Sequence, residues 1–307
     1  MTREYPKIST SQLFCVLLLS RISAEIIYPN KFSETALETV SVTVISEMIR
    51  FLIALPLIIY SFKGCNIHRS VYDKNRFFGW TGAIFSAILL FGAAIRTLLN
   101  ITRFSVKNLL SGGVMWLIFT LAAAFAVYTA VMGVEALARS GAMFLIAAAI
   151  ITVVVFVADI PYIHKTSFES FTYFGNTSSL IPDIIEHVMR GGDYLIFAAM
   201  LPYTAKNRKS ALGKTVILFA VISLLITLII CAMNCLVLRE MYGQCEFPFT
   251  AAASLSDISL FKRLDGFAAA VWSLCAAFRV GAMLVSAKMA LTEVYYAKQD
   301  CKKESAQ

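Results

Sequence analysis

Residues 8–29, ISTSQLFCVLLLSRISAEIIYP, begin as an apolar run and then acquire charge at Arg21 and Glu25. The stretch is long enough to cross a bilayer, which takes about 20 residues of helix. An ionised side chain near the middle of a spanning helix costs roughly 2.5–3.5 kcal/mol on insertion scales, so these two side chains have to face protein or water. Ser20 and Ser23 accompany the charges, and irregular backbone at membrane depth persists only where it lines a cavity. We therefore expect this helix to open in its second half and to hold the binding site.

The whole chain has the composition of a polytopic membrane protein. Of its 307 residues, 59% are hydrophobic and 15% are charged, and its mean hydropathy is +0.74. A soluble domain is about half apolar and a quarter charged. The formal net charge of +8 is typical of basic residues retained in cytoplasmic loops rather than of nucleic-acid binding. We expect an all-α protein that forms a single membrane domain over residues 1–307, with lipid around it and no nucleic-acid partner.

Hydropathy divides the chain into about eight predicted membrane spans. They cover residues 9–28, 39–60, 77–97, 112–132, 138–158, 181–203, 215–238 and 264–288. Short loops rich in Lys and Arg, at residues 61–76 and 206–214, are typical of the cytoplasmic side, which places both termini in the cytoplasm. Arg96, Arg103 and Lys107 run against this orientation, because they follow the third span on the outer side.

The first and sixth spans are both interrupted, and they stand five spans apart. In the sixth, Gly191-Gly192 separates an amphipathic half from a short apolar half, and such a pair typically breaks a helix. Interrupted helices at corresponding places in two halves of a chain indicate a secondary-transporter type of site near the middle of the membrane. Asp193 follows the break with no cation close to it in sequence except Arg190, so it is the best candidate for a polar site residue on this helix.

Charged residues inside the spans allow several pairings. At 1.5 Å per residue, Arg21 on the outward helix reaches about the depth of Glu47 on the inward one, so the two can pair. Glu47 can equally pair with Arg50, and Arg21 with Glu25, along their own helices. These residues form either a structural charge network or part of the ligand site, and both alternatives stay open. Other candidates for the structural network are Glu135, Arg139 and Arg279.

No residue pattern in the chain points to catalysis. The sequence contains no His-Glu-x-x-His, no Gly-x-Ser-x-Gly and no phosphate-binding glycine loop. Its three histidines lie outside the spans or in the amphipathic half-helix, and its seven cysteines match no zinc or redox spacing. We expect neither enzymatic activity nor a bound metal or cofactor.

Several stretches resemble the spore-germination permeases, the integral-membrane B subunits of nutrient germinant receptors. The matching stretches, in chain order, are Lys7–Phe14 with Leu18–Arg21, Gly133–Arg139, Leu201–Pro202 with Lys206, and Phe261–Asp265 with Trp272 and Phe278–Arg279. They resemble the first helix of the family, its Gly-x-Glu-x-x-x-Arg stretch between the fourth and fifth helices, the end of its sixth helix, and its eighth helix. Together they extend over nearly the whole chain in the order of the family.

The resemblance implies a fold similar to that of the amino acid, polyamine and organocation transporters. In that fold two inverted five-helix repeats, with broken first and sixth helices, surround an amino-acid-sized ligand. The family usually has ten spans, so the resemblance implies that the last two are missing here. A partner subunit or a second copy of the chain, giving a homodimer, is then expected to cover the faces that they leave.

The function implied is nutrient sensing, in which the chain binds an amino acid within a complex with the other germinant-receptor subunits. The membrane is then the spore inner membrane or the cell membrane. A secondary amino-acid transporter with sustained flux is the alternative. Freed backbone groups of the first and sixth helices are expected to hold the carboxylate and ammonium of the ligand. The candidate ligand-binding residues are Ser20, Arg21, Ser23, Ala24, Glu25, Gly192, Asp193 and Phe197.

Overall fold

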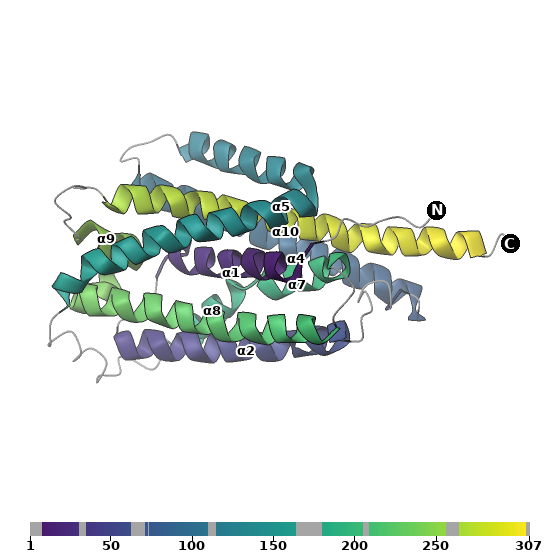
Figure 1. Cartoon of the computed structure of the whole chain (residues 1–307), viewed down its shortest axis with the longest axis horizontal. Helices are drawn as coiled ribbons and strands as arrows, with labels where there is room; N and C mark the ends of the chain where they lie inside the picture. Colours follow the sequence, from purple (N-terminus) through teal and green to yellow (C-terminus); the bar gives the residue numbers. More distant parts are fainter. Residues whose placement is uncertain are drawn as a thin grey trace.

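The computed structural model of the chain consists of helices and their connections. It describes residues 8–30, 35–62, 71–72, 74–109, 115–163, 180–204, 209–255 and 264–304, and no strand occurs among them. Six of the helices are long and apolar enough to cross a membrane. They are α1 (Thr10–Ile27), α2 (Ala36–Phe62), α4 (Arg76–Asn108), α5 (Met115–Asp159), α8 (Lys209–Leu238) and α10 (Leu264–Glu304). These helices pack side by side (Figure 1), and the protein is an all-α, multi-pass membrane protein.

The remaining elements are short. They are the helices α6 (Leu180–Met189), α7 (Asp193–Met200) and α9 (Pro248–Leu255), and the 3-10 turns η1 (Ile160–Tyr162), η4 (Leu201–Tyr203) and η5 (Arg239–Gln244). The sixth predicted span corresponds to α6, α7 and η4 together, whereas α9 lies in a segment without a predicted span. The basic stretches at residues 63–70 and 205–208, which support the predicted orientation, lie outside the described residues, as do residues 261–263 of the stretch that resembles the eighth family helix.

Two predicted spans, 112–132 and 138–158, form the single helix α5, which bends sharply at Gly133. A straight helix of its 45 residues would be about 68 Å long at 1.5 Å per residue, more than twice the thickness of the hydrocarbon core. Gly133 has φ 89° and ψ 177°, a backbone conformation that is essentially restricted to glycine. The two arms fold back at this residue, at the same end of the bundle as the start of α1 and the end of α10 (Figure 1), so α5 accounts for both predicted spans.

The first span is a continuous helix, which corrects the expectation that its backbone opens in the Ser20–Glu25 segment. α1 is helical from end to end. It begins in a capping box, in which the Ser9 hydroxyl accepts from the Gln12 N–H at 3.1 Å and the Gln12 side chain accepts from the Ser9 N–H at 2.9 Å. Ser20 and Arg21 bind groups on α7 and α2, and Ser23 donates to a carbonyl of its own helix, so the backbone does not have to open in order to satisfy them.

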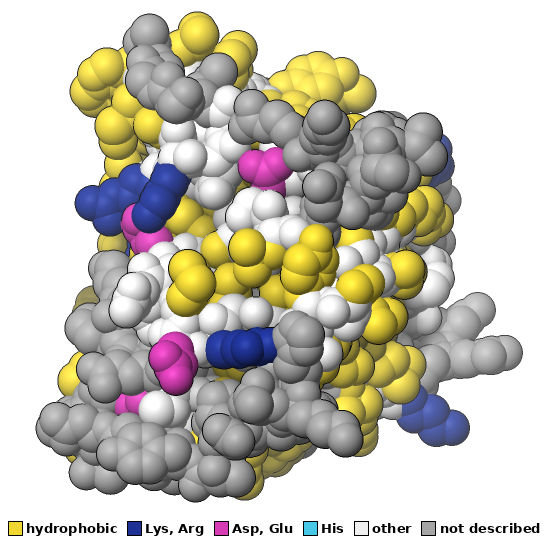
Figure 2. Space-filling model, turned by 90° about the vertical axis from the view of Figure 1, so that its left-hand side faces the viewer, with side chains coloured by type: hydrophobic (Ala, Val, Ile, Leu, Met, Phe, Trp, Pro, Cys, Tyr) yellow, Lys and Arg dark blue, Asp and Glu magenta, His cyan; other side chains and the backbone are white. Residues whose placement is uncertain are grey.

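Large apolar side chains cover the outside of the bundle. Leu52 on α2, Phe85 on α4 and Ile146 on α5 are 62%, 63% and 62% exposed. At the end of the bundle away from the Gly133 bend, apolar side chains also reach the surface, with a few basic side chains next to acidic ones (Figure 2). Soluble monomers rarely expose apolar patches of this extent, and contact with lipid accounts for them.

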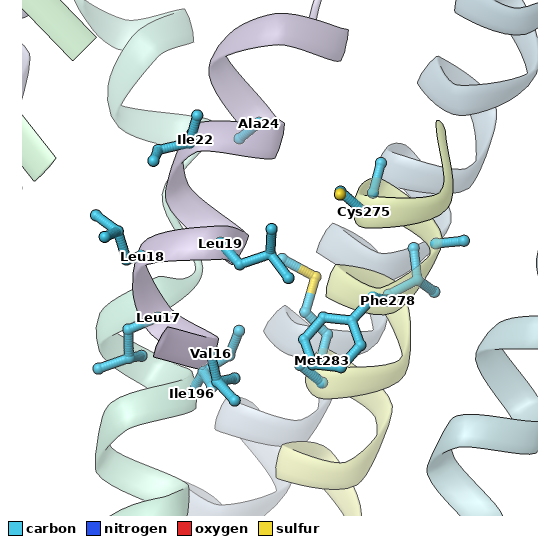
Figure 3. Close-up of a cluster of buried hydrophobic side chains, with 14 of the residues drawn as sticks. Val16, Leu17, Leu18, Leu19, Ile22, Ala24, Ile196, Cys275, Phe278 and Met283 are labelled. Carbon is cyan, nitrogen blue, oxygen red and sulfur yellow. The ribbon is translucent and has the colours of Figure 1, made fainter. Parts of the chain in front are cut away.

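The centre of the bundle is formed by α1 and α10. Of the most apolar part of each helix, 67% is buried in α1 and 72% in α10, against 22% in α5. Val16 and Leu19 from α1 lie with Phe278 and Met283 from α10 in a buried hydrophobic cluster (Figure 3). Gly141 brings α5 close to both helices, because a Cβ there would lie 2.9 Å from Val16 and 3.1 Å from Phe278. The polar site is built on the second half of α1, beside this apolar packing.

Candidate functional site

The sixth span is interrupted at Arg190-Gly191-Gly192, between α6 and α7, as the sequence predicts. Gly192 has φ −121° and ψ 0° and provides no side-chain cap for α7. A Cβ on Gly191 would lie 2.6 Å from Cδ of Arg50, so the glycine also lets α2 approach. Asp193 opens α7, where the helix dipole stabilises a carboxylate. The break therefore places non-helical backbone next to the charged side chains of Asp193 and Arg50 inside the bundle.

Arg279 of α10 joins α1 to this break. Its Nη1 donates to the carbonyl oxygen of Ser20 at 2.8 Å, and its Nη2 donates to that of Arg190 at 2.5 Å. The Arg190 carbonyl follows α6, where a helix leaves carbonyl groups without partners. Arg279 is completely buried and forms no ion pair within the described part of the chain. It thus acts through the backbone and does not belong to the charge network that the sequence predicts for it.

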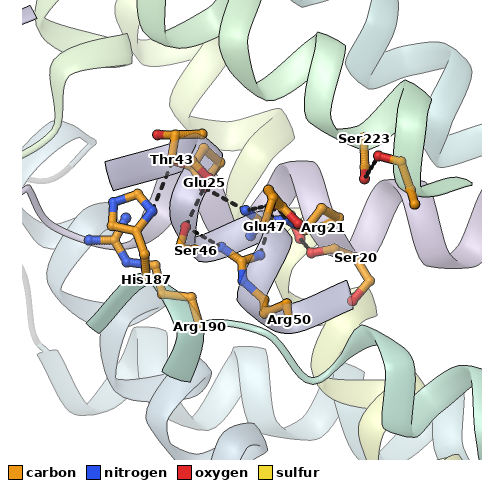
Figure 4. Close-up of polar contacts among 12 residues, drawn as sticks. Ser20, Arg21, Glu25, Thr43, Ser46, Glu47, Arg50, His187, Arg190 and Ser223 are labelled. Carbon is orange, nitrogen blue, oxygen red and sulfur yellow. Dashed lines mark hydrogen bonds and ion pairs between the residues drawn. The ribbon is translucent and has the colours of Figure 1, made fainter. Parts of the chain in front are cut away.

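Buried charges on α1 and α2 form a cluster (Figure 4). Glu47 Oε1 accepts from Arg21 Nε at 2.6 Å and from Arg50 Nη1 at 2.9 Å. Arg21 Nη2 also lies 3.3 Å from Glu25 Oε2. All three pairings that the sequence allows are therefore present at once, and mutual neutralisation is what lets charged groups persist at membrane depth. Asp193 of α7 extends the cluster, because it accepts a hydrogen bond from the Ser20 hydroxyl.

The helices around the cluster are apolar outside and polar inside. On α6, Asp183 and His187 are buried, whereas Ile181 and Ile185 are 69% and 57% exposed. α2 likewise buries its charged residues, whereas its large apolar side chains Met48, Leu52 and Ile53 are exposed. An amphipathic helix of a soluble protein shows the reverse arrangement. In a membrane this pattern directs polar groups toward a protected interior site.

A small cavity lies between α1 and α6, next to the cluster. Its volume is about 30 Å³, which is room for roughly two water molecules. Glu25 and Arg190 both line it, so a carboxylate and a guanidinium face the same space. Three further lining atoms are buried without a hydrogen bond to any described residue: Asn30 Nδ2, His187 Nδ1 and Arg190 Nε. Buried polar groups are normally hydrogen-bonded, so these atoms mark a place where a polar molecule fits.

Arg190 is the cation of this cavity. Its Nη2 donates to the Pro29 carbonyl at 3.1 Å, and its guanidinium carbon lies 5.7 Å from the centre of the Tyr28 ring. It has no carboxylate within ion-pair distance in the described part of the chain. Unlike Arg279, it borders open space. A buried guanidinium with these partners favours binding of an additional anionic group.

Half of the candidate ligand residues come together in the structure. Ser20, Arg21, Glu25 and Asp193 belong to the polar cluster, but Ser20 and Asp193 bind each other, which closes the site expected between α1 and α7. Ser23 donates to the Ser20 carbonyl of its own helix at 3.0 Å. Gly192 lies at the break. The last two candidates, Ala24 and Phe197, are buried among apolar side chains.

Sequence reasoning missed His187, Arg190 and Tyr28 as site residues. Asp183, His187 and Arg190 are spaced four and three residues apart, which places them on one face of a helix. This spacing was the available signal, because an apolar helix with one polar face has to direct that face toward protein. For Tyr28, which closes α1, no comparable signal exists in the sequence.

Hydrogen bonding and ion pairing to a small polar molecule are the chemistry that these groups supply. No group of three His, Cys, Asp or Glu side chains placed to hold a metal ion occurs among the described residues. Comparison of the chain with protein-family models gives no match, and comparison with curated proteins gives none either.

Proposed function

We propose that this chain is the membrane subunit of a nutrient germinant receptor and binds an amino acid in the cavity beside Glu25 and Arg190. The observation that carries the proposal is that both charged side chains face one cavity, three of whose lining atoms, Asn30 Nδ2, His187 Nδ1 and Arg190 Nε, are buried without a hydrogen bond to a described residue. The ammonium group of an amino acid complements Glu25, and its carboxylate complements Arg190. The assignment to germination rests on the resemblance of four stretches to the spore-germination permeases.

Ligand binding requires this cavity to widen, because about 30 Å³ is far below the roughly 300–1,000 Å³ of typical ligand pockets. α6 is the element placed to move, since it is 10 residues long and continues into α7 only through the glycine pair. Its displacement would alter the bond between Arg279 and the Arg190 carbonyl. Ligand binding would thereby change the position of α10, and this movement would be transmitted to the other receptor subunits.

Equilibrium dialysis of the full-length protein in mild detergent, against each common amino acid, tests the site. We expect saturable binding of at least one amino acid and a loss of affinity of about tenfold or more in Arg190→Gln, because a charge-assisted hydrogen bond is worth about 1.5–3 kcal/mol. Arg139→Gln makes the same change at an exposed position and should bind like the parent. Arg190→Lys replaces the glutamine variant if size-exclusion chromatography shows that the latter does not fold. Absence of binding to any amino acid, or equal binding by a folded Arg190 variant, would refute the site.

Sensing and transport differ in what happens after binding. A sensing subunit in proteoliposomes should bind a labelled amino acid without exchanging it across the membrane. Counterflow that increases with the amount of protein would instead identify a secondary transporter with sustained flux.

We also propose that both termini lie in the cytoplasm of a spore or cell bounded by this membrane. The start of α1, the end of α10 and the Gly133 bend lie at one end of the bundle (Figure 1), and Arg139 follows that bend. In a background without the seven native cysteines, Arg139→Cys should resist an impermeant thiol reagent in intact cells, whereas Arg103→Cys near the opposite end of α4 should react. The inverse labelling pattern would overturn the orientation.

A further inference from the structure

A second cavity lies along the C-terminal half of α4 and is separate from the first. Its volume is about 320 Å³, which reaches the lower end of the range of about 300–1,000 Å³ for small-molecule pockets. Arg96, Asn100 and Arg103 line it from α4, and Glu186 lines it from α6. The cavity is thus large enough for a small organic molecule without rearrangement.

The cations on this face of α4 are unequally neutralised. Arg96, Arg103 and Lys107 are seven and four residues apart, which places them along one side of the helix. Arg96 Nη2 pairs with Glu186 Oε1 at 2.9 Å, and Lys107 Nζ pairs with Glu246 Oε2 at 2.8 Å. Arg103 lies between them, is exposed, and has no partner in the part of the chain that the structure describes. These are the same three residues that run against the positive-inside rule.

The free groups in the cavity are suited to an anion. Asn100 is 8% exposed, and its side chain makes no hydrogen bond to a described residue. Arg96 and Arg103 together outweigh Glu186 by one positive charge. An arginine binds a carboxylate through two parallel hydrogen bonds, and an amide supplies two further donors. We infer that this cavity binds a small carboxylate anion, held by Arg103 and Asn100, with Leu99 and Met115 beside its apolar part.

The Tyr28–Pro29 segment forms a wall between this site and the cavity beside Glu25, and each cavity binds its own ligand. Tyr28 lines the first cavity and Pro29 the second. The guanidinium carbon of Arg96 lies 5.4 Å from the centre of the Tyr28 ring, and the Pro29 carbonyl accepts from Arg190. A carboxylate at Arg103 therefore lies on the opposite side of this wall from Arg190. The inference stands whether or not the first cavity binds an amino acid.

The test is equilibrium dialysis of the full-length protein in lipid-free detergent with labelled succinate, a carboxylate without an ammonium group. Succinamide, which has similar size and no charge, is the control ligand. We expect succinate to bind, succinamide not to bind, and Arg103→Gln to weaken succinate about tenfold or more. Arg139→Gln and Arg190→Gln should retain succinate binding, which separates this site from the amino-acid site. Since Arg103 has no described partner, its replacement should leave folding intact, and an unchanged elution volume verifies this.

Three results would overturn the inference. One is the absence of succinate binding by the parent protein, and another is equal succinate affinity in Arg103→Gln. The third is displacement of succinate by phosphatidylglycerol in an Arg103-dependent manner, with tighter binding of the lipid. That result would assign the cations to a lipid phosphate group instead of a small carboxylate.

Discussion

Two arginine–glutamate pairs in this chain use the same chemistry in opposite surroundings. Arg21 and Glu47 join α1 to α2, and their side chains are 2% and 8% exposed. Arg139 and Glu135 lie one turn apart within α5 at 2.5 Å, and their side chains are 69% and 49% exposed. An exposed pair contributes about 0–1 kcal/mol because water competes for it, whereas removing one partner of a buried pair costs about 3–5 kcal/mol. The sequence predicts the exposed pair as structural and leaves the buried pair open between a structural network and the ligand site, and only the buried pair connects two helices.

The position of each pair explains the difference. Glu135 follows Gly133, the bend at the end of the bundle, where a side chain can leave the packed interior. Glu47 lies within α2 and accepts from two arginines. The stability contribution of a charged pair in a membrane helix therefore depends on how close the pair lies to an end or bend of the helix.

Glu47→Gln should have the largest effect on stability. The change leaves Arg21 and Arg50 without the carboxylate that they share, and breaking a buried pair costs about 3–5 kcal/mol. Folded yield and the midpoint of thermal unfolding in detergent should both fall clearly. A variant as abundant and as heat-resistant as the parent would show that water already screens this pair.

Gly191→Ala should have an intermediate effect. The new Cβ would lie 2.6 Å from Arg50 Cδ, so the charged cluster has to shift, and overpacking of this kind costs about 1–3 kcal/mol. Gly92→Ala on α4 is the matched control, because nothing lies within 4 Å of its Cβ position. The control should be neutral or slightly stabilising, since alanine has the higher helix propensity. Equal unfolding midpoints for the two variants would contradict close packing at the break.

Glu135→Gln should have the smallest effect. It removes an exposed i, i+4 pair worth about 0.3–0.5 kcal/mol, and added salt should abolish the difference from the parent. A loss of stability as large as that of Glu47→Gln would mean that a partner subunit buries this pair.

The sequence predicts helix breaks, and contacts between consecutive helices at the same membrane depth, better than it predicts contacts between distant segments. The sixth-span break follows from two adjacent glycines, and the Arg21–Glu47 pair follows from counting residues along two helices joined by a short loop. The bond between Ser20 and Asp193 joins residues 173 positions apart, and that between Arg279 and the Ser20 carbonyl joins residues 259 positions apart. No local pattern indicates which distant helices are neighbours. For this reason the closed contact between α1 and α7, and the cavity beside Arg190, emerge only from the structure.

The central claim is that the cavity between Glu25 and Arg190 recognises both charged ends of an amino acid. Its most direct test is titration calorimetry with the best-bound amino acid, its deaminated analogue and its amide. The Arg103→Gln background keeps any carboxylate site at the second cavity from contributing. We predict that both analogues bind about tenfold more weakly or worse, that Glu25→Gln no longer distinguishes the deaminated analogue, and that Arg190→Gln no longer distinguishes the amide. If either analogue binds as tightly as the amino acid, or if both variants keep both preferences, the claim is wrong.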